Sequence, residues 1–120
     1  MTRLHLVLIV AVAALMLAIA GTASAAATPR LDGTVGPGFT ITLKTKAGAK
    51  VSKLKPGKYQ IVVKDQSSIH NFHLTGSGVN KDSGISSTGT KTWTVTLRKG
   101  TYIFVCDPHA SSMKGKFTVA

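Results

Sequence analysis

The chain has a single cysteine, Cys106, in the segment YIFVCDPHASSMKG, where His109 and Met113 follow it closely. A thiolate is a strong soft donor, an imidazole is intermediate, and a thioether is weak and soft. This combination suits copper that alternates between Cu(I) and Cu(II) better than it suits zinc or iron. Electron-transfer copper sites combine a thiolate with two imidazoles and a long axial thioether. A second histidine must therefore come from elsewhere in the chain.

Two candidates for this histidine, His70 and His73, stand in the segment SIHNFHL. Residues three apart on an extended strand point to opposite faces, so both imidazoles cannot bind one ion while the strand stays regular. His70 shares its face with Phe72 and Leu74, which should point into the interior. We therefore favour His70 as the ligand and interpret His73 as a surface histidine. His73 remains a possible alternative ligand if the strand bulges.

The N-terminus has the layout of a signal peptide over residues 1–25: a basic start, an apolar run at residues 6–20 and the small residues ASA before the cut. The apolar run is shorter than the ~20 residues that span a bilayer, so cleavage is favoured over an uncleaved anchor. The protein is expected to be exported, to a periplasmic, extracellular or cell-surface location. Membrane contact is expected only through this segment, if it is retained. A lone thiol in an oxidising compartment cannot form an internal disulfide, so Cys106 needs deep burial or a ligand.

The charge balance is strongly basic, with 15 Lys and Arg against four acidic residues, all Asp. Loss of Arg3 with the signal peptide leaves a formal charge of +10. Such a surface either keeps the protein soluble or steers it to an acidic partner with a salt-sensitive association rate. Nucleic acid is an unfavoured partner, because the lysines are scattered, aromatic residues are few among them, and the protein is expected to be exported.

Apolar residues alternate in several short segments separated by Gly, Pro, Ser and Asn, and no segment shows helical spacing. The sequence predicts an all-β fold, a Greek-key sandwich or barrel preceded by the signal helix. Residues 26–37 are predicted as a short linker, residues 38–120 as one domain, and residues 75–89 as a polar surface loop. The predicted strands cover residues 39–44, 58–64, 69–74, 90–97, 101–106 and 115–119.

The segments IHNFHL and YIFVCDPHASSMKGKFTV resemble the two copper-binding segments of the cupredoxins, in particular the plastocyanin, pseudoazurin and amicyanin group. The resemblance implies a single type 1 (blue) copper ion. Its implied ligands are the first imidazole, the thiolate, a more exposed second imidazole and the axial thioether, namely His70, Cys106, His109 and Met113.

The resemblance also places two residues beside the ligands. Asn71 matches a position whose amide bridges the two ligand segments, and Pro108 is expected to shape the turn after Cys106. One difference concerns spacing: three residues separate His109 from Met113, whereas plastocyanins usually have four and amicyanins two.

The expected function is that of a small exported electron carrier, not an enzyme, which passes single electrons between redox partners. Electrons would enter or leave through His109 across an apolar patch that includes Pro108 and Ala110. The protein is expected to be a monomer, and its redox partner to have an acidic surface. Two alternatives remain: a copper-binding protein for storage, delivery or resistance, and a metal-free interaction module with the same fold.

Overall fold

The computed structural model describes residues 21–22 and 26–120. The predicted signal peptide lies outside the described residues, apart from Gly21 and Thr22, and it remains a prediction. In the described part of the chain, no helix is both long enough and apolar enough to cross a membrane.

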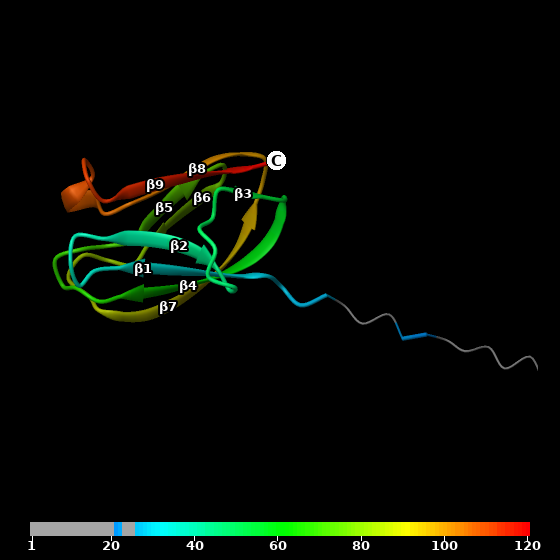
Figure 1. The fold of residues 1–120 in the computed structure, drawn as a ribbon, viewed down its shortest axis with the longest axis horizontal. Coiled ribbons are helices and arrows are strands. Elements are labelled where there is room, and N and C mark those ends of the chain that lie inside the picture. The colour runs from blue at the N-terminus through cyan, green and yellow to red at the C-terminus, as the bar shows by residue number, and fades with distance from the viewer. Residues whose placement is uncertain (1–20, 23–25) are drawn as a thin grey trace, which may run out of the picture.

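The described chain folds into two β-sheets that face each other, with one short 3-10 helix (Figure 1). The first sheet has the strand order β2-β1-β4-β7 and the second has the order β3-β9-β8-β5-β6. The elements are β1 (Arg30–Val35), β2 (Ile41–Thr45), β3 (Lys53–Leu54), β4 (Gly57–Asp65), β5 (His73–Gly76), β6 (Val79–Asp82), β7 (Gly89–Leu97), β8 (Gly100–Val105), η1 (Asp107–His109) and β9 (Lys114–Val119).

Both sheets are mixed. In the first, β1 runs parallel to β4 and antiparallel to β2, and in the second, β3 runs parallel to β9. The chain crosses between the sheets repeatedly, so strands that are neighbours in a sheet are often distant in sequence. The all-β sandwich predicted from the alternating segments is confirmed.

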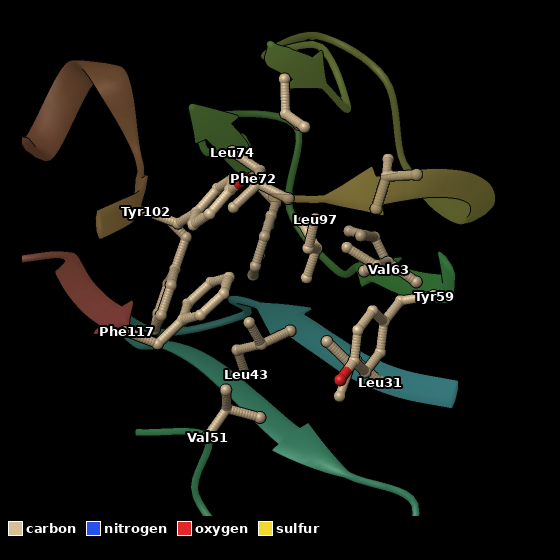
Figure 2. Close-up of a cluster of buried hydrophobic side chains, with 14 of the residues drawn as sticks. Leu31, Leu43, Val51, Tyr59, Val63, Phe72, Leu74, Leu97, Tyr102 and Phe117 are labelled. Carbon is tan, nitrogen blue, oxygen red and sulfur yellow. The ribbon is translucent and has the colours of Figure 1, made fainter. Parts of the chain in front are cut away.

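The core lies between the sheets, where apolar side chains from both inner faces meet (Figure 2). Leu31, Val63 and Leu97 come from the first sheet, and Tyr102 and Phe117 come from the second. The rings of Tyr102 and Phe117 are stacked, with centroids 5.2 Å apart. This packed interior fixes the position of the strand ends from which the loops of the site emerge.

The boundary predicted for the domain needs a correction, because β1 lies inside the stretch predicted as a linker. Leu31, Gly33 and Val35 alternate as buried residues along β1. The glycine hides this period in the sequence. The packing nevertheless requires a glycine at this position, since a Cβ at Gly33 would stand 3.0 Å from the ring of Phe72.

Two further predictions differ from the structure. The segment at residues 75–89, predicted as a polar surface loop, contains the short strand β6. Only Val79 of this strand is buried, so the sequence of β6 lacks the alternation of apolar residues that indicates a strand. The segment at residues 69–74 is not one strand, because β5 begins at His73 and residues 70–72 form part of the preceding loop. His70 and His73 therefore do not share a regular strand.

Three loops meet at one end of the sandwich, the end that carries the short helix η1 in Figure 1. They connect β1 to β2, β4 to β5, and β8 to β9. The ring contacts among Phe39, His70 and His109, one from each loop, show that these loops touch. The candidate site lies where they meet.

Candidate metal centre

Cys106 directly follows β8 and is fully buried. The loop that begins there closes on itself through backbone hydrogen bonds. Cys106 N donates to Met113 O over 2.9 Å. His109 N donates to Cys106 O over 3.0 Å, and Met113 N donates to His109 O over 2.8 Å. The shape of the loop is therefore set locally, and His109 lies within it, at the end of η1.

Three donor atoms converge at this point: Nδ1 of His70, Nδ1 of His109 and Sγ of Cys106. The two nitrogens lie 3.1 Å apart, and the sulfur lies 3.6 Å from His70 Nδ1 and 3.5 Å from His109 Nδ1. Ligand atoms that are about 2.0–2.3 Å from one ion stand about 3.3–3.7 Å apart at tetrahedral to trigonal angles. The separations observed here are close to that range, so the three atoms fit a single ion.

The chemistry of the donor set agrees with this geometry. Two imidazoles and one thiolate in a trigonal arrangement are typical of blue-copper sites. His70 is fully buried, and its Nε2 has no hydrogen-bond partner among the described residues. Nδ1 is thus the nitrogen of this imidazole that faces the other donors. The group formed by His70, Cys106 and His109 is suited to binding one copper ion.

Met113 is also buried, with 1% of its surface exposed. Its backbone is held to both Cys106 and His109 by the hydrogen bonds that close the loop. The spacing of three residues between His109 and Met113 is therefore compatible with a closed loop. The role of Met113 as an axial ligand stays a prediction.

The segment that carries His70 is held by a buried polar cluster. Ser83 Oγ accepts a hydrogen bond from Phe72 N over 2.8 Å and donates to Asp65 Oδ2 over 2.8 Å. Asp65 Oδ1 accepts a hydrogen bond from Ser67 N over 3.2 Å. Asp65 is 2% exposed, so it is a buried anchor for this loop as well as a residue at the turn after β4. No local pattern in the sequence indicates its pairing with Ser83.

Asn71 connects the two ligand segments, as the resemblance implied. Its Oδ1 accepts a hydrogen bond from Asp107 N over 2.7 Å, and its Nδ2 donates to Asp107 Oδ2 over 2.7 Å. The same Nδ2 donates to Asp82 Oδ1 over 2.9 Å. Asn71 is fully buried. Pro108 lies in the first turn of η1, where its fixed φ suits the helix.

His73 lies outside the group of three donors. Its Nδ1 is 2.9 Å from Asp107 Oδ2, and its Nε2 is 2.7 Å from Asn80 Oδ1. Partial burial by itself would lower the pKa of His73, but the hydrogen bonds to Asn80 and Asp107 and the charges of Asp107 and Asp82 outweigh it, so the pKa is raised above 6.5. This arrangement favours our interpretation of His73 as a partly exposed histidine rather than a ligand of the same ion.

Asp82 belongs to the same cluster. Its partial burial favours the neutral acid, but the hydrogen bond from Gly84 N, the hydrogen bond from Asn71 and the nearby charges of His73 and Lys91 lower its pKa below 3.8. The carboxylate is therefore ionised at neutral pH and acts as a fixed acceptor for Asn71.

Phe39 is a residue of the site that the sequence analysis missed. Its ring is 65% exposed and lies edge-on to both imidazoles, with centroids 5.1 Å from His70 and 4.9 Å from His109. The strand predicted for residues 39–44 begins at Phe39, but β2 begins at Ile41. The signal that could have identified it is an aromatic residue within the turn segment GPGF, where no strand partner would bury it.

Comparison with known proteins agrees with this geometry. The profile of the family described as "Cupredoxin-like domain" matches residues 8–119. No curated protein sequence matches the chain.

Among solved structures, reduced rusticyanin is similar over 81% of this chain and 82% of its own, with a TM-score of 0.57 and 22% identity. Rusticyanin from Thiobacillus ferrooxidans is similar over 76% of each chain, with a TM-score of 0.54 and 24% identity. At this level of identity the similarity shows a shared fold. Because the family profile covers nearly the whole chain, and the fold and the three donors agree with it, the protein belongs to the cupredoxin-like domain family.

Proposed function

We propose that this protein is a small copper protein that carries single electrons between redox partners. The observation that supports the proposal is the convergence of His70 Nδ1, His109 Nδ1 and Cys106 Sγ within 3.6 Å of one another at a buried site. Met113, held beside them by its backbone, would supply the axial thioether. Bound copper supplies the one-electron chemistry.

The contribution of the chain is to hold the donors in nearly one geometry. Backbone hydrogen bonds fix the loop from Cys106 to Met113, and Ser83 and Asp65 fix the segment that carries His70. Asn71 joins the two. Because these contacts do not depend on the oxidation state of an ion, the site would rearrange little when an electron is gained or lost. This rigidity suits a carrier that has no catalytic turnover of its own.

Electrons would pass through His109, the half-buried imidazole of the site. Pro108 and Ala110 beside it are exposed, and Phe39 adds an aromatic edge that touches the ring. These four residues would form the contact surface for a redox partner.

The charge of the surface favours an acidic partner. All four acidic residues of the chain are held in local contacts: Asp65 is buried, Asp32 pairs with Arg30, and Asp82 and Asp107 accept hydrogen bonds from Asn71. The basic side chains therefore dominate the field, and association with an acidic partner would weaken as salt rises. We also propose that the protein is exported by residues 1–25 and acts as a monomer.

Voltammetry of the copper-loaded protein tests the carrier role. A reversible one-electron wave with rapid exchange is expected. Oxidation of the Cu(I) form by anionic hexacyanoferrate should slow as salt is added, whereas oxidation by a cationic cobalt complex should not. A copper storage or delivery protein would instead bind one oxidation state much more tightly than the other. Irreversible voltammetry with such a bias would contradict the proposal.

A further inference from the structure

His73 and its partners form a polar cluster beside the metal centre that the proposed function does not use. We propose that His73 is a positioning residue: through Asp107 it holds the loop that carries Cys106 and His109 against the segment that carries His70. The inference rests on the copper-binding role proposed above, and it concerns residues that touch no ligand atom of that site.

The side chains of His73 and Asn71 both contact the carboxylate of Asp107, the residue that follows Cys106. His73 Nδ1 lies 2.9 Å from Oδ2 and 3.1 Å from Oδ1 of this carboxylate. Asn71 Nδ2 donates to the same Oδ2 over 2.7 Å. Asp107 thus takes hydrogen bonds from two residues on the other ligand segment, and its own backbone amide donates back to Asn71.

The imidazole of His73 is held in place from its other side. Its Nε2 is 2.7 Å from Asn80 Oδ1, so the ring is fixed between Asn80 and Asp107. His73 is the first residue of β5 and is paired across the sheet with both Asp82 on β6 and Val105 on β8. The side chain therefore extends from a paired strand, a firmer support than a loop.

The ligand loop, residues 106–113, must be held in place by contacts with other parts of the chain. Its internal backbone hydrogen bonds set its shape, but they do not set its position relative to the segment that carries His70. Among the described side chains, hydrogen bonds join the two segments only through Asn71 and His73, apart from the contacts between the donor atoms themselves. Removal of His73 leaves Asn71 as the one hydrogen-bonded tie of this kind in the described structure.

The composition of the chain makes this arrangement unusual. Only four carboxylates are present against 15 basic residues, and two of the four, Asp82 and Asp107, lie in this cluster. A carboxylate next to Cys106 that served only for solubility would have no need of two donors from another segment. The pairing instead fits a structural tie between the segments.

The same residues also have the composition of a cation site, because ligand atoms of His73, Asp82 and Asp107 lie within 4.8 Å of one another. The hydrogen bonds from Asn71 to both carboxylates fill the inner side of this cluster without an ion. We therefore favour the tie, and the experiment includes a measurement that separates it from a second metal ion.

The test compares wild type with His73→Leu, which removes both hydrogen bonds, and with His73→Gln, which keeps an amide donor for Asp107. Arg30→Gln is the matched control, because it removes another surface ion pair, the one between Arg30 and Asp32. Copper affinity is measured by chelator competition, the geometry of the site by electron paramagnetic resonance, and loop mobility by deuterium exchange of residues 106–113 in the copper-free protein.

We expect His73→Leu to lower copper affinity by roughly 10-fold, the lower end of what is typical for residues that orient metal ligands. Deuterium exchange in the ligand loop should be faster, the resonance spectrum should shift, and His73→Gln should restore most of each property. The control should match wild type. In an Asp107→Ala background, His73→Leu should have no further effect on affinity.

Several results would overturn the inference. One is a His73→Leu variant with wild-type exchange in the copper-free loop and wild-type affinity. Another is that His73→Leu lowers copper affinity by the same factor in the Asp107→Ala background as in wild type. Binding of a second equivalent of copper or zinc by wild type, lost in His73→Leu, would assign the cluster to a cation instead. If wild type itself bound no copper through its thiolate, the proposed function would fail, and the exchange data from the copper-free protein would still decide the structural tie.

Discussion

Asn71 provides a prediction whose size can be worked out from its contacts. Replacement by alanine removes a neutral hydrogen bond to Asp107 N and two hydrogen bonds to the carboxylates of Asp107 and Asp82. A neutral hydrogen bond contributes about 1 kcal/mol net, and one to a charged group about 1.5–3 kcal/mol. Both carboxylates are partly exposed, so water replaces the lost donor in part, and the low end of these values applies.

The expected result is that Asn71→Ala lowers the free energy of unfolding of the copper-free protein by about 4 kcal/mol. Urea denaturation at pH 7 measures this loss as a lower midpoint with an unchanged slope. Gln60→Ala is the control, because Gln60 is exposed on β4, and the change should stay within about 0.5 kcal/mol.

A second variant separates hydrogen bonding from side-chain shape. Asn71→Asp keeps the shape and the acceptor for Asp107 N, but it places a third carboxylate against Asp82 and Asp107. We expect it to be less stable than Asn71→Ala at neutral pH, because like charges in a buried position repel. A loss below about 1 kcal/mol for the alanine variant, or an aspartate variant as stable as wild type, would refute the reasoning.

Three further predictions concern packing, exposure and pH. Gly115→Ala should destabilise the protein by about 1–3 kcal/mol in urea denaturation, because a Cβ there would stand 2.2 Å from the ring of Phe104; an unchanged midpoint would show that the ring can move away. Phe39→Ala should speed deuterium exchange at the C2 carbon of His109 in the copper-free protein, because the exposed ring covers that imidazole, whereas Ile103→Ala, which removes another exposed apolar side chain, should not. An exchange rate in Phe39→Ala equal to that of wild type would contradict the contact. The raised pKa of His73 implies a stabilisation that is complete below pH 6.5 and is lost as pH rises through the higher pKa of the folded state. The difference in free energy of unfolding between wild type and His73→Gln should therefore shrink as pH rises above 6.5. A difference that stays constant over this range would contradict the prediction.

The candidate metal-binding residues and most strands could be proposed from the sequence because their signals are local. Donor chemistry singled out Cys106, His109 and Met113 within one loop, and alternation of apolar residues located strands such as β4, β7 and β8. His70 was favoured for its apolar neighbours Phe72 and Leu74, and both are buried in the structure.

Other features depend on contacts between distant segments, which no local pattern reports. β1 was missed because Gly33 makes room for Phe72, a residue 39 positions later in the chain. The pairing of His73 with Asp107 spans 34 positions, and the contact of Phe39 with His109 spans 70. Each became visible only when the loops were placed together at one end of the sandwich.

The central claim is that Cys106 and two histidines bind one copper ion, and a Cu(II) titration of the purified protein tests it most directly. Visible absorption and electron paramagnetic resonance are followed for wild type and for Cys106→Ser. We predict an intense blue thiolate-to-copper charge-transfer band that saturates at one equivalent and is absent in Cys106→Ser. A colourless wild-type product, or a blue band that survives in the serine variant, would contradict the claim.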